Sequence, residues 1–325
     1  MSRIGHAARI LVLALCAACT GAASSSAQTD YPSRLVKIIV PTAAGGATDL
    51  TARSAGRALS DALGQTFVVE NRPGAHGFLA ANALLKEKPD GYTLLMMASS
   101  QSALPAFYEL PYDPIGDFSP IALLSIAPVV LVVNASLPVS SVTDFVGYAK
   151  QHPREITFGY QANGTHLSCA LLAKLAGIEA VAVPFAASAQ VATELVAGRL
   201  TFTLMTTEQA KVHVDAGRLR ALATAGAKRA NAFSDIPTLA ELGYNVDGTG
   251  WFGLVGAAGL PRPIADKLYA ALRQHYIGKA GQAALVAAGL EAGDEGPQEF
   301  TNRLKSEVAR WMRIGAELGV AKGKL

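Results

Sequence analysis

Hydrophobic residues along the chain follow two alternating patterns. Short runs rich in Val, Ile and Leu predict buried strands over 35–41, 67–71, 92–98 and 121–134. Between these runs, apolar residues recur every three or four positions, which predicts helices over 48–64 and 78–88. Strands that alternate with helices are typical of α/β proteins, so we expect an α/β fold with largely parallel sheets.

The same alternation continues after residue 137. Helices are predicted over 141–151, 165–177 and 188–197, and strands over 156–160, 180–185, 201–205 and 219–226. The run 251–261 is interpreted as a strand returning to a neighbouring lobe, where we expect Trp251 and Phe252 to pack at the lobe junction. Two further helices are predicted over about 262–277 and 297–318.

A chain of 325 residues with two such series of elements is long for a single sheet, so we expect two lobes. Residues 28–128 plus 248–325 are assigned to lobe 1 and residues 129–247 to lobe 2, with hinge crossings near 129 and 248. Closure of two lobes about a hinge is a common way to trap a small ligand. The pattern therefore favours a ligand cleft between the lobes.

The first 27 residues have the pattern of a secretory signal peptide. Arg3 and Arg9 precede a short apolar run, and small residues follow up to Ala27, after which we place cleavage. The alternative is lipid attachment at Cys19, which small residues also precede. Cys169 is then the one cysteine beyond the leader, so no internal disulfide is expected, and its helical context predicts a small buried apolar residue.

Composition excludes several classes of partner and chemistry. The net charge of +3 and the absence of Lys/Arg runs give no indication of nucleic-acid binding. The histidines show no HxxxH or HExxH spacing, so no metal site is predicted, and no GxSxG motif or carboxylate pair indicates catalysis. We therefore expect no cofactor and no catalytic residues.

A glycine pair marks the first candidate site, in PTAAGGATD at 41–49. Gly45 and Gly46 let the backbone approach a ligand, and the following helix presents free N–H groups to an anion. Neither a phosphate-loop lysine nor a third glycine is present, so a nucleotide is not indicated. A tight turn without a ligand fits the same residues. Asp49 is interpreted first as a helix-capping residue that can pair with Arg53, and alternatively as a ligand contact.

Three more loops follow predicted strands and precede helices or polar segments. They contain Ser99, Ser100 and Gln101 in a polar loop up to Ser102, then Asn163, Gly164, Thr165 and His166, then Ala187 and Ser188. Ligands of open α/β sheets bind outside the carboxyl ends of strands. We therefore expect these three loops and the glycine loop at 41–49, two loops from each lobe, to face one cleft.

These blocks resemble the tripartite tricarboxylate transporter solute receptors, the Bug-type periplasmic binding proteins. The matching segments are YPSRLVKIIVPTAAGGATDLTAR, LGQTFVVENRPGAHG, KPDGYTLLMMASS, IPTLAELGY and WFGLVGAAGLPRPI, which together span the mature chain in order. The resemblance implies a two-lobed periplasmic binding protein of type II, the Venus-flytrap fold. It also implies a carboxylate ligand, held by residues matching Thr42, Ala43, Ala44, Gly45, Gly46, Asp49, Ser99, Ser100, Asn163, Gly164, Thr165, His166, Ala187 and Ser188.

Several positions depart from the family pattern. Thr42 and Ala44 stand where an aromatic residue and a proline are usual, and Thr207 stands where an aspartate is usual. His76 replaces a glycine, and Ala186-Ala187 replace Lys-Gly. With these differences the resemblance implies a pocket for a bulkier or less charged acid. We keep Gln101 and Thr207 among the candidate ligand-binding residues.

The sequence therefore predicts a monomeric periplasmic receptor that delivers a small organic acid to membrane transporter subunits. One alternative is a receptor that presents its liganded form to a membrane sensor kinase. The other is a periplasmic enzyme on the same scaffold.

Overall fold

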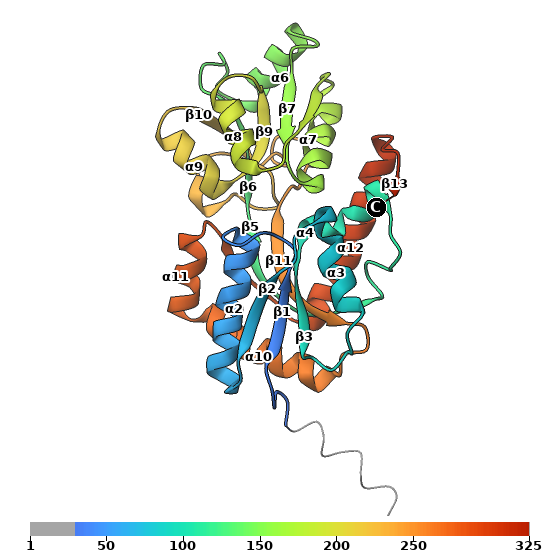
Figure 1. The fold of residues 1–325 in the computed structure, drawn as a ribbon. Coiled ribbons are helices and arrows are strands. Elements are labelled where there is room, and N and C mark those ends of the chain that lie inside the picture. The colour runs from blue at the N-terminus through green and yellow to red at the C-terminus, as the bar shows by residue number, and fades with distance from the viewer. Residues whose placement is uncertain (1–29, 325) are drawn as a thin grey trace, which may run out of the picture.

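The computed structural model describes residues 30–324, which form two lobes that each surround one β-sheet (Figure 1). The predicted signal peptide, with Cys19, lies outside the described residues. Within residues 30–324, every helix is too short or too polar to cross a membrane.

The first sheet has six strands in the order β12-β5-β11-β3-β1-β2. Their bounds are β1 (Val36–Val40), β2 (Phe67–Asn71), β3 (Thr93–Ala98), β5 (Phe118–Ala127), β11 (Gly250–Ala257) and β12 (Glu291–Glu295). β1 runs parallel to β2 and β3, whereas β11 runs antiparallel to β3 and β5, and β12 antiparallel to β5. The prediction of largely parallel sheets was therefore wrong here. β11 enters from the other lobe instead of from a crossover helix, which reverses its direction.

Helices cover both faces of this sheet. They are α2 (Ala47–Leu63), α10 (Arg262–Ile277) and α11 (Lys279–Ala287) on one face, and α3 (Phe78–Leu85) and α12 (Pro297–Glu317) on the other. Side chains of a strand alternate between faces. Ile38 and Val40 accordingly belong to the core under α2, while Ile39 belongs to the core under α3 and α12. Because a core covers each face of the sheet, side chains on both faces of its strands are buried, and the strands therefore appear in the sequence as continuous apolar runs.

The second sheet has five strands in the order β10-β6-β9-β7-β8. Their bounds are β6 (Val129–Asn134), β7 (Thr157–Tyr160), β8 (Val181–Pro184), β9 (Phe202–Thr206) and β10 (Leu219–Thr224). β7 is parallel to β8 and β9, and β6 is antiparallel to β9 and β10, so this sheet is mixed as well. The helices are α6 (Val142–Gln151), α7 (Asn163–Ala176), α8 (Ser188–Val196) and α9 (Thr207–Asp215). Cys169 is fully buried in this lobe, as predicted.

Several details of secondary structure differ from expectation. The predicted strand run 121–134 is divided into β5 and β6, which belong to different sheets, and β12 was not predicted. Residues 99–102, predicted as a polar loop, form the short helix α4 (Ser99–Ser102), which α5 (Leu104–Phe107) follows. α7 begins at Asn163, and α9 and α11 were not predicted. The remaining short elements are η1 (Ala75–Gly77), η2 (Asn231–Phe233) and the parallel pair β4 (Tyr108–Glu109) and β13 (Gly323–Lys324).

The chain crosses between the sheets at Pro128, between β5 and β6, and returns between β10 and β11 (Figure 1). This course supports the assignment of residues 28–128 plus 248–325 to one lobe and 129–247 to the other, which stays a prediction. α12 adds a third link. Its residues Trp311 and Ile314 pack in the core of the second lobe, and Lys174 Nζ of α7 donates a hydrogen bond of 2.6 Å to the carbonyl of Glu317.

Candidate ligand-binding site

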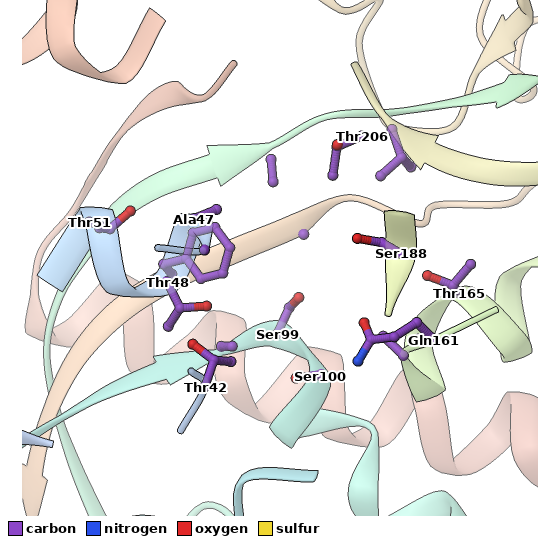
Figure 2. Close-up of a pocket in the computed structure, with 18 of the residues that line it drawn as sticks. Thr42, Ala47, Thr48, Thr51, Ser99, Ser100, Gln161, Thr165, Ser188 and Thr206 are labelled. Carbon is purple, nitrogen blue, oxygen red and sulfur yellow. The ribbon is translucent and has the colours of Figure 1, made fainter. Parts of the chain in front are cut away.

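A cavity of about 1060 Å³ lies between the two lobes. Thr42, Thr48, Ser99 and Ser100 of the first lobe face Gln161, Thr165, Ser188 and Thr206 of the second across this space (Figure 2). Residues of both crossings, among them Ala127, Val129 and Gly248, also line it. A change in the angle between the lobes would therefore change the shape of the cavity directly.

Five helices begin at this cavity, three of them in the second lobe. They are α2, α4, α7, α8 and α9, each of which directly follows a strand and lines the cavity with residues of its first turn. No side chain caps the N-terminus of α2, α7 or α9. The first N–H groups of a helix lack partners within the helix and carry the positive end of its dipole. The cavity therefore receives positive backbone charge from these helix starts, least from α4, which is a single turn, and from α9, whose first N–H is bonded to the Pro128 carbonyl.

The loop between β1 and α2 is held in shape by Asp49. Its carboxylate accepts hydrogen bonds of 2.9 Å from the Gly45 N–H, from Asn71 Nδ2 and from Arg53 Nε. Asn71 Nδ2 also donates to the carbonyl of Thr42 at 3.0 Å. Gly45 has φ +91°, a conformation that favours glycine. Asp49 thus supports the loop from behind and does not line the cavity.

The ionisation of Asp49 follows from these contacts. Burial, the largest single influence, raises the pKa of this carboxyl group, but the hydrogen bonds from Arg53, Gly45 and Asn71 together outweigh burial and lower the pKa below its ordinary value. The side chain is only 2% exposed, so the ion pair with Arg53 is largely shielded on this side. The carboxylate therefore stays charged at neutral pH.

Gln101 has a similar supporting role in the second loop. Its Oε1 accepts a hydrogen bond of 3.1 Å from the Ala98 N–H, and its Nε2 donates to the carbonyl of Gly77 at 3.3 Å. The side chain is buried and does not line the cavity, whereas Ser99 and Ser100 do. Gln101 thereby fixes the first turn of α4.

In the second lobe, the start of α7 brings Asn163, Gly164 and Thr165 to the cavity. His166 turns away from it and stacks on Tyr160 with ring centroids 4.2 Å apart. Its ring also lies 5.6 Å from that of Phe107 in the first lobe. Burial lowers the pKa of His166, which favours the neutral imidazole. His166 therefore contributes to the contact between the lobes.

The starts of α8 and α9 complete this wall. Ser188 lines the cavity, and its Oγ accepts a hydrogen bond of 3.0 Å from Gln209 Nε2, which lines the cavity too. Ala187 does not line it. Thr207 is buried, and its N–H donates to the carbonyl of Pro128 at 3.0 Å, so it anchors the first crossing. The neighbouring Thr206 faces the cavity instead (Figure 2).

Two polar atoms at the cavity lack a partner within residues 30–324. They are Thr42 Oγ1 in the first lobe and Asn163 Nδ2 in the second, and both atoms are shielded from solvent. An unpaired buried polar group costs roughly 1–3 kcal/mol. A bound molecule or water that pairs with these two atoms would recover that free energy from both lobes at once.

Ionisable side chains are few around the cavity. Of the described residues that line it, Arg57 and His76 are basic and Glu208 is acidic, and all three side chains are exposed, which places them at its margin. The part of the chain that the structure describes also contains no group of three His, Cys, Asp or Glu residues that could hold a metal ion. The interior of the cavity therefore offers mainly peptide groups, hydroxyl groups and amides as polar groups.

The structure separates the predicted site residues into two sets. Those that line the cavity are Thr42, Ala43, Gly45, Gly46, Ser99, Ser100, Asn163, Gly164, Thr165 and Ser188. Those outside its lining are Ala44, Asp49, Gln101, His166, Ala187 and Thr207. In this second set, Asp49 and Gln101 use their polar side chains in hydrogen bonds within the protein, and His166 stacks on Tyr160.

Other lining residues were not predicted as ligand contacts. They include Ala47, Thr48, Gln161, Thr206, Phe252 and Trp311. Ala47 and Thr48 lie inside the predicted glycine loop at 41–49, although neither was named as a contact, and Gln161 and Thr206 lie within two residues of a predicted contact. Phe252 was expected to pack at the lobe junction, but it is half-buried and lines the cavity, while Trp251 is buried against Phe300. No sequence signal places Trp311 there, because it arrives from the distant helix α12.

This fold and this site define a two-lobed solute-binding protein. The family model described as "Tripartite tricarboxylate transporter family receptor" matches residues 51–320. The chain belongs to this family. It is therefore a receptor and not an enzyme.

Named relatives and solved structures agree with this assignment. Protein BugT of Bordetella pertussis is 31% identical and is aligned over 95% of this chain and 97% of its own. The structure "R. palustris Rpa4515 with adipate" has 35% identity and a TM-score of 0.80, and covers 91% of this chain and 100% of that one. MatC of Rhodopseudomonas palustris with bound malate has 29% identity and a TM-score of 0.75, and covers 88% and 100%.

Proposed function

We propose that this protein is a periplasmic receptor that binds a small organic acid in the interlobe cavity and delivers it to a membrane transporter of the tripartite tricarboxylate type. The observation that carries the proposal is the convergence of five helix N-termini, from both lobes, on one cavity. Helix N-termini favour carboxylates, through free N–H groups and the helix dipole. The relatives with adipate and with malate support the same ligand class.

The proposed ligand contacts are the cavity-lining members of the predicted set. We assign the carboxylate to the N–H groups at the start of α2, with the hydroxyl groups of Ser99 and Ser100 beside it. Thr42 Oγ1 and Asn163 Nδ2, which lack partners within the described residues, pair with the ligand or with water bound to it. Because these groups come from both lobes, the ligand binds the closed arrangement more tightly than an open one, which is what drives closure.

The predicted signal peptide and the family support a periplasmic location. The family description supports delivery to transporter subunits, and no feature of the described residues favours a sensor kinase in their place. We keep the monomer as the predicted state.

The test is native mass spectrometry of freshly purified protein, followed by a thermal-shift screen of organic acids that includes adipate and malate. A ligand at a hundred times its Kd stabilises the folded state by about 2.7 kcal/mol. Gly46→Val serves as the blocked variant. The backbone at Gly46 has φ −83° and ψ 169°, and a Cβ there would meet no atom within 4 Å, so the fold tolerates a side chain at this position, which lines the cavity. Equal stabilisation of wild type and variant by the ligand, or no carboxylate ligand at all, would contradict the proposal.

A further inference from the structure

The cavity continues away from the helix N-termini along one face of α2. Leu50, Ser54 and Arg57 line this extension, and their spacing of four and three residues places them on the same side of the helix. At a rise of 1.5 Å per residue, the distance from Leu50 to Arg57 is about 10 Å. The opposite wall is formed by Ala284, Leu285 and Ala288 of α11 and its C-terminal end. α11 stands beside α2 in Figure 1. We name this extension the α2–α11 groove.

The walls of the groove are mostly apolar. Leu285 and Leu290 are buried beneath it, and Leu50 projects beside it with 47% of its surface exposed. An exposed leucine next to two buried ones offers a surface that a hydrocarbon chain would cover favourably, at about 25 cal/mol per Å² of apolar area. The groove therefore suits the apolar part of a ligand better than a polar one.

The basic residue Arg57 lines the far end of the groove. Within residues 30–324, no carboxylate lies within 4.0 Å of the Arg57 guanidinium, whereas Arg53 one turn earlier is paired with Asp49. The Arg57 charge also reaches Tyr276, whose pKa burial raises to about 12 while the hydrogen bond from Ser54 and the Arg57 charge act in the opposite direction. Tyr276 belongs to α10, which packs on α2. Because Arg57 itself lines the cavity and is exposed, its charge is accessible to a ligand in the groove.

We propose that the α2–α11 groove is a second subsite, which takes the distal carboxylate of an elongated dicarboxylate. The proposal rests on the proposed function, since the first carboxylate sits at the helix N-termini. The methylene chain lies against Leu50 and Leu285, and the distal carboxylate pairs with Arg57. A short dicarboxylate cannot occupy both ends, because the start of α2 and Arg57 are separated by more than two helical turns.

The experiment is isothermal titration calorimetry in low-salt buffer with succinate, adipate, sebacate and monomethyl sebacate. The monoester matches sebacate in length but lacks the distal charge. We expect wild-type protein to bind sebacate roughly fivefold more tightly than the monoester, the preference that one partly exposed ion pair supports, with the preference falling as salt is added. Arg57→Gln removes this preference. Arg313→Gln is the matched control, because Arg313 is exposed and does not line the cavity.

Each outcome decides the proposal. Loss of the sebacate preference in Arg57→Gln, but not in Arg313→Gln, supports it. If adipate binds but sebacate has no advantage over its monoester, or keeps that advantage in Arg57→Gln, the groove proposal is wrong and the carboxylate receptor stands. If none of the dicarboxylates binds to wild-type protein, both proposals fail.

Discussion

The backbone N–H of Gly45 donates a hydrogen bond of 2.9 Å to Oδ2 of Asp49, the same oxygen that accepts from Arg53. The acidic residue nearest the predicted anion site is therefore neutralised and turned inward. An exposed carboxylate there would repel a bound acid. In this arrangement it orients the loop that we propose as the acid-binding loop.

Replacing Asp49 with Ala should lower both stability and ligand affinity. The change removes the acceptor of the Gly45 N–H, one of the two acceptors of Asn71 Nδ2 and the ion-pair partner of Arg53. Each lost hydrogen bond costs about 0.5–1.5 kcal/mol. Urea unfolding measures the loss of stability, and calorimetry measures the affinity. Replacement of the exposed Asp61 by Ala is the matched control on the same helix. Equal stability of wild type and Asp49→Ala would contradict this role.

The contribution of Asp49 should also depend on pH. Its pKa is lowered in the folded protein, whereas an unfolded aspartate titrates near about 3.9. The stabilisation from its ionised form is therefore fully present above about pH 4 and is lost as the pH falls through the lower folded pKa. The difference in unfolding free energy between wild type and Asp49→Asn should be largest at neutral pH and shrink toward pH 2. A difference that grows on acidification would be inconsistent with this sign.

A proline at position 47 should remove one donor without removing the helix. Ala47 is the first residue of α2, where proline is well tolerated, and Gly46 before it is already extended with ψ 169°. Ala47→Pro deletes an N–H group at the cavity, so we expect affinity for the acid to fall about tenfold, as hydrogen bonds to charged groups contribute roughly 1.5–3 kcal/mol. Ala47→Val keeps the N–H and adds similar bulk. Comparable affinity losses in both variants would indicate a steric effect instead.

A side chain at Gly289 should hold the lobes apart. A Cβ at Gly289 would lie 2.1 Å from Cβ of Glu208, which belongs to α9 in the opposite lobe. Gly289→Ala should therefore increase the radius of gyration in small-angle X-ray scattering with ligand present, and weaken binding.

Gly289→Ala also strains the backbone, because position 289 has a positive φ, and a second variant measures that effect separately. Gly289 has φ +66°, and Gly217 has φ +67° with open space where a Cβ would stand, since no atom lies within 4 Å of that position. Gly217→Ala should lose similar stability, about 1–2 kcal/mol, without loss of affinity. Glu208→Gly should restore closure in the Gly289→Ala background. Failure of this second change to restore binding would show that the Glu208 contact is not the cause.

Trp311 should report ligand binding by fluorescence. The sequence contains two tryptophans, Trp251 in the core of the first lobe and Trp311 at the cavity against Gly164. Arg310 stacks on the Trp311 ring at 4.0 Å, and the indole N–H donates to Glu307 at 3.1 Å. We expect a ligand-dependent change in emission that persists in Trp251→Phe and disappears in Trp311→Phe. A signal that depends on Trp251 would contradict this assignment.

Much of the fold could be predicted from local patterns. β2 and α10 match their predicted ranges, because an apolar run between turn residues and a long amphipathic repeat determine each of them. α9 was missed because TEQAKVHVD has many polar residues and a weak apolar stripe, and α4 because a single helical turn has no period to detect. Strand direction could not be read locally, since it depends on how the chain crosses between lobes.

The candidate site was predictable where it lies directly after a strand. Thr42, Ser99 and Thr165 line the cavity because strand ends of each sheet meet there. The spacing of four residues predicted the pair of Asp49 with Arg53, which the structure contains. The contact of Asp49 with Asn71 and the inward direction of Gln101 could not be predicted, because these partners and Gly77 are distant in sequence.

The proposed binding of the ligand through peptide N–H groups has an evolutionary consequence. A codon change can replace a side chain, but it cannot delete a peptide donor unless it introduces proline. The anchoring chemistry can therefore persist while wall residues such as Phe252 and Arg57 diverge, so that descendants of one receptor acquire new ligands without first losing the ability to hold an acid.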